Sequence, residues 1–222
     1  MNEAPPRQVV VLLEDAALAH AVIELSSAIA QRLQRPLELV YVESAPALLA
    51  AALPFTQVLA PGGAQWMPFE PDDVERGYRA QAARLRALAE RILLRRTVRW
   101  SMRVTRGALA QVALELHAGT DLVLVGAGAS AAAALAEPRR PARRRPVVVV
   151  VADDSPAGQQ ARRVGEELAQ ALPCELRLLP AHGRGDGPAA GIGRCDLLVI
   201  PAALVEPRDL AQPAQPTLIV GG

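Results

Sequence analysis

Runs of uninterrupted apolar residues recur along the chain and predict buried strands. The first run, Val9–Leu13, contains no polar residue, and neither does the run over Val148–Ala152. A run without polar alternation is typical of a parallel strand that is covered on both faces. Further strands are expected over Leu37–Val42, Thr97–Val104, Asp121–Val125 and Glu175–Leu179, in DLLVIPAALV from Asp196, and in the closing PTLIVGG.

Segments with helical periodicity separate these strands. Over Ala16–Gln34, the residues Val22, Leu25, Ile29 and Leu33 recur at close to helical spacing. Two more helices are expected, from Asp72 to about Leu94 and over Ala108–His117. A strand, a helix and a second strand in succession form a unit that nearly always crosses right-handed. The pattern therefore predicts an α/β fold with a parallel sheet.

The same pattern occurs twice. VVVLLEDAALAHAVIELSSAIAQRLQRPLELVYVE from Val9 aligns without a gap with VVVVADDSPAGQQARRVGEELAQALPCELRLLPAH from Val148. DLVLVGAGAS from Asp121 is echoed by the run from Asp196. We expect two repeated halves, over residues 1–137 and 146–222, joined by an Arg/Pro-rich linker at 138–145. The second half is abbreviated, and the halves are expected to share one interlocked architecture.

An insertion distinguishes the first half. Residues 44–73 contain several prolines, a Gly-Gly pair, and the aromatic residues Phe55, Trp66 and Phe69. A long irregular segment of this kind is usually functional or disordered, and its apolar content argues against disorder. We expect either an ordered flap or interface patch, or a segment that only covers its own core. We expect an intramolecular pseudo-dimer, or homodimerisation through Pro54–Phe69 or the last strand, and Pro54–Phe69 could also bind a protein partner.

Composition excludes several kinds of chemistry. The formal net charge is +1, and all 24 basic residues are arginines. The absence of lysine excludes Schiff-base catalysis and the lysine of a GxxxxGK[ST] phosphate loop. The five arginines between Arg139 and Arg145 are interrupted by proline and lack interleaved aromatic residues, so we expect a solvated linker and no nucleic-acid partner.

The cysteines and the N-terminal residues give no sign of export. Cys174 and Cys195 are expected to precede strands on opposite sides of Val148–Ala152, too far apart for a disulfide. No signal peptide precedes the first strand, and no apolar run reaches membrane-spanning length. These observations predict a cytoplasmic protein with reduced cysteines and no membrane partner.

The repeated segments resemble the universal stress protein family. VVVVADDSPAG from Val148 is similar to the family's opening ILVAVDGS, LVYVE at Leu39–Glu43 to its second strand, and DLVLVGAGAS to its DLIVMGxxG. The resemblance implies a tandem, degenerate pair with the adenine-nucleotide α-hydrolase-like sandwich of that family. It also implies a regulatory stress-response role, ATP or AMP at the carboxyl ends of the strands, and dimerisation through a fifth strand.

Both copies depart from the family's phosphate loop, G-x2-G-x9-G-[ST]. Ala129 stands where the second glycine is expected, and AAAALAEPRRP follows without a Gly-[Ser/Thr]. The other copy has Pro201 followed by two alanines. Nucleotide binding is therefore expected to be weakened or lost. The remaining candidates for cofactor contact, some of them implied only by the resemblance, are Glu14, Val42, Gly126, Gly128, Ser130 and Asp153.

A second group of residues suggests a different chemistry. If the strands at Val148–Ala152 and Glu175–Leu179 are parallel neighbours, Asp153, Ser155 and His182 lie near one another and could form a nucleophilic site. The alternative is that Ser155 caps a helix that begins at Pro156. No histidine has partners at metal-ligand spacing.

Three hypotheses follow. The first is a universal-stress-type protein that acts by binding or association, not as an enzyme. The second is an ATP- or AMP-binding switch that uses the Gly126–Ser130 turn. The third is a small hydrolase built on Asp153, Ser155 and His182.

Overall fold

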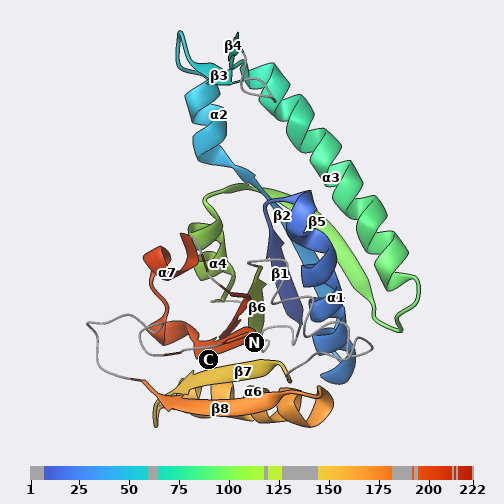
Figure 1. Ribbon diagram of the computed structural model, residues 1–222, viewed down its shortest axis with the longest axis vertical. Helices are drawn as coiled ribbons and strands as arrows, with labels where there is room; N and C mark the ends of the chain where they lie inside the picture. Colours follow the sequence, from blue (N-terminus) through green and yellow to red (C-terminus); the bar gives the residue numbers. More distant parts are fainter. Residues whose placement is uncertain are drawn as a thin grey trace, which may run out of the picture.

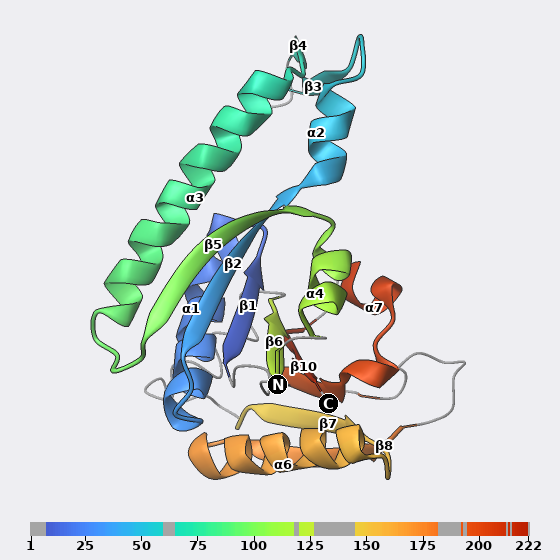
Figure 2. The same cartoon turned by 180° about the vertical axis from the view of Figure 1, so that it is seen from behind.

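The fold is described from a computed structural model. It describes residues 8–59, 65–117, 120–126, 145–181, 195–211 and 215–221, together with Ile192 and Pro213. Gly128, Ser130, His182 and most of the predicted linker lie outside the described residues. The chain is drawn in Figure 1 and, from behind, in Figure 2.

One eight-stranded sheet carries the fold, in the order β5-β2-β1-β6-β10-β9-β7-β8. Its strands are β1 (Val9–Leu13), β2 (Leu37–Ser44), β5 (Trp100–Gly107), β6 (Leu122–Val125), β7 (Val147–Ala152), β8 (Glu175–Pro180), β9 (Leu197–Pro201) and β10 (Thr217–Val220). The strands β5, β2, β1 and β6 form one parallel half-sheet, and β10, β9, β7 and β8 form the other. The two half-sheets meet where β6 and β10 pair antiparallel. The predicted α/β class with a largely parallel sheet is confirmed.

The aligned segments pair in the same register in both halves of the sheet. Val9 of β1 lies opposite Leu37 of β2, and Val148 of β7 lies opposite Leu176 of β8, 139 positions later in each case. Val9 also lies opposite Leu122 of β6, as Val148 lies opposite Leu197 of β9. The aligned segments thus pair in equal register, and the two-repeat organisation stays a prediction.

Helices cover the two faces of the sheet. One face carries α1 (Ala16–Arg32), α3 (Pro71–Leu93) and α6 (Pro156–Ala171), and the other carries α4 (Leu109–His117) and α7 (Pro207–Ala211). The helix pair α4 and α7 lies across the sheet from α1 (Figure 2). On the α1 face, one cluster of buried residues runs through both halves, because α1 contacts α6 as well as α3.

The insertion is more regular than the sequence suggested, so the prediction of an irregular segment was wrong for its described part. It forms α2 (Ala45–Ala51) and a hairpin of β3 (Gln57–Leu59) and β4 (Trp66–Pro68), and α3 follows directly. Pro46 lies near the start of α2, and Pro71 is the first residue of α3. Proline suits the first turn of a helix, because a backbone N–H there has no acceptor within the helix. Two of the prolines that suggested irregular structure, Pro46 and Pro71, therefore mark helix starts.

Two other boundaries differ slightly from expectation. The strand expected at Thr97–Val104 begins three residues later, at Trp100, and α1 ends at Arg32 because Gln34 adopts a positive φ of 53°. Within the described residues, no helix is both long and apolar enough to cross a membrane.

Gly165 tests the packing between α6 and the sheet. A Cβ at this position would lie 2.3 Å from Val150 Cγ2, inside the buried core. We expect Gly165→Ala to lower the free energy of unfolding by about 1–3 kcal/mol, because the β-branched neighbour cannot move away without disturbing the strand. Urea denaturation measures this change.

Gly77→Ala is the matched control. Gly77 is an exposed residue of α3, and a Cβ there would meet nothing within 4 Å. This change should raise stability by roughly 0.5–1 kcal/mol, since alanine favours the helix more than glycine does. Equal effects at the two positions would contradict the close packing of α6.

Candidate functional site

The sheet offers two separate edges for a ligand. In open parallel sheets, ligands bind at the carboxyl ends of the strands, where the strand order reverses. Here the order reverses between β1 and β6 in one half and between β7 and β9 in the other. Because β6 and β10 are antiparallel, the carboxyl ends of the two half-sheets point to opposite ends of the molecule.

At the first edge, the structure brings two predicted residues to neighbouring strand ends. Glu14 follows β1 and Gly126 follows β6, and their strands pair at Leu12 and Val125. Partial desolvation raises the pKa of Glu14 although its side chain is exposed. Val42 is different, since its side chain is buried and only its backbone is available to a ligand.

Gly126 lies against α1. A Cβ at this position would come within 2.9 Å of Val22 Cγ2, so glycine lets the chain leave β6 close to the helix. The predicted contacts at Gly128 and Ser130 lie outside the described residues. The first-half phosphate site therefore stays a prediction.

An ion-pair network occupies the part of the first edge next to β2. Arg106 Nε donates to Glu43 Oε2 at 2.8 Å, and its Nη2 donates to Glu75 Oε1 at 3.1 Å. Glu43 is only 8% exposed, so Arg106 neutralises a nearly buried carboxylate. This arginine is thereby committed to two carboxylates of the chain itself.

A pair of tyrosines lies beneath this network. The rings of Tyr41 and Tyr78 meet edge to face with centroids 6.3 Å apart. Tyr41 Oη donates to Gln81 Oε1 at 2.9 Å, and Tyr78 Oη donates to the Ser44 carbonyl at 3.2 Å. Burial is the main cause that raises the pKa of Tyr41 to about 12 and raises that of Tyr78 as well. The sequence analysis did not identify this cluster, which only the packing of α3 on β2 creates.

At the second edge, Ser155 caps α6. Its Oγ accepts a hydrogen bond from the Gly158 N–H at 3.0 Å and donates to Asp153 Oδ1, while its own N–H donates to the same oxygen at 3.2 Å. Pro156 takes the first helical position, so the interpretation of Ser155-Pro156 as a helix start is confirmed. A Cβ at Gly158 would lie 2.2 Å from Asp153 Oδ1, so glycine lets this carboxylate approach the helix.

Two of the three residues of the predicted hydrolase site can be placed in the structure. Asp153 and Ser155 are in contact, but the Ser155 hydroxyl already takes part in two hydrogen bonds of the cap. His182, the third residue of the predicted nucleophilic site, lies outside the described residues. Catalysis by this group stays a prediction.

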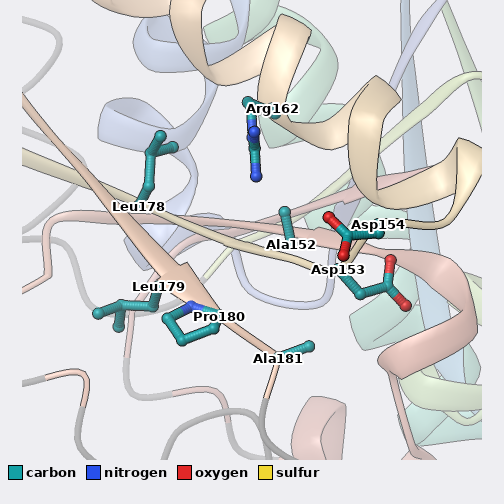
Figure 3. A pocket seen from close by; sticks show the side chains of 8 residues that line it. All are labelled: Ala152, Asp153, Asp154, Arg162, Leu178, Leu179, Pro180 and Ala181. Atoms are coloured by element: carbon teal, nitrogen blue, oxygen red, sulfur yellow. The ribbon is translucent and has the colours of Figure 1, made fainter.

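A pocket of about 370 Å³ opens beside the capped turn. Arg162 extends from α6 toward the strands on one side, and Asp153 and Asp154 lie on another (Figure 3). Among the described residues, neither Arg162 nor Asp154 has an ion-pair partner. The remaining lining is formed by Ala152, Leu178, Leu179, Pro180 and Ala181.

The residues around the pocket differ from their counterparts in the first half. Arg162 aligns with Ile23, and Leu178 aligns with Leu39, both at a separation of 139 positions. In the first half, α3 packs on α1, and Ile23 and Leu39 are buried. No described helix takes that place over β8, and Leu178 is 46% exposed. Asp153 was predicted from the sequence and Arg162 was not, although the alignment of Arg162 with the apolar Ile23 was an available signal.

The described residues provide neither a reactive thiol nor a metal site. Cys174 and Cys195 are free and precede β8 and β9, on opposite sides of β7, as the sequence predicted. Burial raises the pKa of the Cys195 thiol to about 11 and also raises that of Cys174, so neither is a ready thiolate. The described part of the chain contains no group of three metal-ligating side chains.

Comparison with known proteins finds similarity to solved structures but no match by sequence. No protein-family profile and no curated protein sequence matches the chain. Among solved structures, it is similar to one described as "Crystal structure of universal stress protein in complex with cAMP", with 16% sequence identity and a TM-score of 0.30. The match covers 81% of this chain and 99% of the other. The TM-score is too low for any detail of that protein to be transferred.

Ser155→Ala tests the cap. We expect the free energy of unfolding to fall by about 1 kcal/mol, because the Gly158 N–H loses its acceptor. Ser155→Thr should keep most of the stability, and Ser101→Ala, on the exposed side of β5, should change it little. Thermal and urea denaturation measure these differences, and an unchanged stability in Ser155→Ala would refute the capping role.

The two tyrosines predict a loss of stability at high pH. Their pKa values in the folded protein lie above the ordinary value of 10.0, and that of Tyr41 reaches about 12. The neutral phenols therefore contribute stability that is complete below pH 10 and is lost as the pH rises toward 12. We expect Tm to fall over this range, with tyrosinate absorbance appearing late in the titration.

Tyr41→Phe shows which tyrosine produces the latest tyrosinate absorbance. It should remove the latest part of the tyrosinate absorbance, while Tyr78→Phe should leave that part in place. If both phenols ionise at the ordinary pKa while the protein is still folded, the proposed burial of Tyr41 is wrong.

Proposed function

We propose that this is a universal-stress-type protein that acts by binding or association, with nucleotide binding weakened or lost. The α/β sheet, the equal register of its two halves and the family-like segments support this proposal. A stress-response or regulatory role follows from the resemblance to that family and belongs to the proposal.

The start of α6 has few free N–H groups, which disfavours strong phosphate binding there. Helix starts bind anions through free backbone N–H groups. Here Pro156 has no N–H, and the N–H of Gly158 is taken by Ser155. The Asp153 carboxylate lies directly against this turn, so an anion would meet like charge.

The first edge supports the same conclusion. Glu14, Glu43 and Glu75 lie at or beside its strand ends, and the guanidinium of Arg106 is already paired with two of them. A phosphate would have to compete with these internal partners. The ATP- or AMP-binding alternative would therefore depend on the residues that follow Gly126.

The pocket beside β8 is the place where we propose that a small ligand binds. Its volume falls in the range of small-molecule sites, and it combines apolar walls with one guanidinium and two carboxylates. These mixed charges suit a small polar molecule better than a triphosphate.

Nucleotide titration tests the proposal. We expect ATP, ADP, AMP and cAMP at millimolar concentration to stabilise the protein by less than about 0.4 kcal/mol, the value reached when ligand concentration equals Kd. Thermal shift measures this stabilisation, and isothermal titration calorimetry checks it. Stabilisation by more than about 1.4 kcal/mol would overturn the claim of weakened binding.

Asp154→Asn tests the electrostatic cause. If the carboxylates at the second edge repel phosphate, this variant should bind AMP more tightly than the wild-type protein. Glu167→Gln is the control, because it removes the same charge from an exposed position of α6 that does not line the pocket. Equal gains in both variants would indicate a general charge effect.

A further inference from the structure

Exposed apolar side chains gather on the arm formed by α2, β3, β4 and the start of α3. Among the described residues, ten large apolar side chains are exposed, and seven of them lie on this arm. We refer to these seven as the apolar tip: Leu49, Leu53, Phe55, Val58, Leu59, Trp66 and Met67. The arm projects beyond the end of the sheet (Figure 1), so the body of the chain does not cover it.

Backbone hydrogen bonds hold the arm in one conformation. The Phe69 N–H donates to the Thr56 carbonyl at 3.0 Å, and Val58 pairs with Met67 in the hairpin. Every residue of β3 and β4 is nevertheless exposed. A two-stranded hairpin without a covering layer is at best marginally stable, so this hairpin needs a further surface to pack on.

Phe55 is the strongest sign that the surface has a function. Its side chain is 99% exposed, and its φ of 67° lies in the left-handed region, which a bulky residue rarely adopts. Neither packing within the chain nor backbone preference explains a phenylalanine at this position. Strained residues of this kind cluster at functional surfaces.

We propose that the apolar tip is a homodimer interface, in which the arms of two copies pack on each other about a two-fold axis. Aromatic side chains present about 150–250 Å² each when fully accessible. With the five aliphatic side chains beside Phe55 and Trp66, all of them 43% exposed or more, the tip exposes on the order of 800 Å². A standard interface buries about 800 Å² per partner. The area is therefore sufficient for a specific dimer, and it exceeds the patch of roughly 300–600 Å² that monomers usually show.

The charges beside the tip favour a second copy over a membrane. Glu70, Asp72 and Asp73 precede Arg76 and Arg79 at the start of α3. Acidic residues at this position disfavour an anionic lipid surface. The mixture of signs allows two copies to approach without net repulsion, and closed two-fold dimers are the commonest symmetric assembly.

This interface is independent of the proposed ligand site. The pocket is lined by residues of β7, β8 and α6, whereas the tip lies on the arm at the opposite end of the molecule (Figure 1). Dimerisation through the arms would thus leave the pocket beside β8 accessible. A failed nucleotide experiment says nothing about the dimer, and a monomeric protein says nothing about the pocket.

Analytical ultracentrifugation between about 1 and 100 µM tests the proposal. The wild-type protein should show a reversible monomer–dimer equilibrium. Phe55→Asn should raise the dimer Kd at least about 30-fold, as expected for an aromatic hot spot. Since asparagine tolerates positive φ, the same variant should unfold at an equal or higher temperature than wild-type protein at a concentration where both are monomeric.

Two further variants complete the test. Trp66→Ser should also weaken the dimer, whereas Leu94→Asp, at an 87% exposed position just after α3, should leave Kd unchanged. A wild-type protein that stays monomeric overturns the proposal, including when it binds phosphatidylcholine vesicles through the tip. A dimer whose Kd is the same in Phe55→Asn and Trp66→Ser also overturns it.

Discussion

β10 is the last strand of the chain, and it joins the two half-sheets by pairing with β6 on one side and β9 on the other. Its residues Leu218, Ile219 and Val220 have no exposed surface. Gly221 then donates its N–H to the Asp121 carbonyl at 2.8 Å, at a point where a Cβ would lie 2.5 Å from the Thr120 carbonyl oxygen. Because β10 is paired on both edges and covered on both faces, it makes one sheet out of two parallel sets of strands.

The antiparallel join at β10 decides where ligand chemistry can occur. It turns the carboxyl ends of the two half-sheets away from each other, so the acidic turns after β1 and β7 form separate edges. The surroundings of the two edges differ. Arg106 is held by Glu43 and Glu75 near the first edge, while Ser155 closes the helix start at the second.

The unequal length of the halves accounts for the exposed features. In the first half, α3 packs on α1 and covers that face, and the insertion that precedes α3 forms most of the projecting arm. In the second half, the equivalent face has no such cover among the described residues. Arg162 and Leu178 therefore line a pocket where Ile23 and Leu39 form core. The same difference in length thus yields both the apolar tip and the proposed ligand pocket.

The sequence by itself determined the strands of the main sheet and the longer helices, and it contains the same pattern of residues twice. Continuous apolar runs are sufficient to locate β1 and β7, and Ser155-Pro156 is sufficient to start α6, because these signals act over a few neighbouring residues. Only the tertiary structure decided that β10 joins the half-sheets, that Tyr41 packs under Tyr78, and that Arg162 lines a pocket. Each of these depends on contacts between residues far apart in the chain, whose geometry local periodicity does not specify. The arm follows the same rule, since prolines that suggest a loop also suit helix starts, and only the packing of α2 and α3 distinguishes the two.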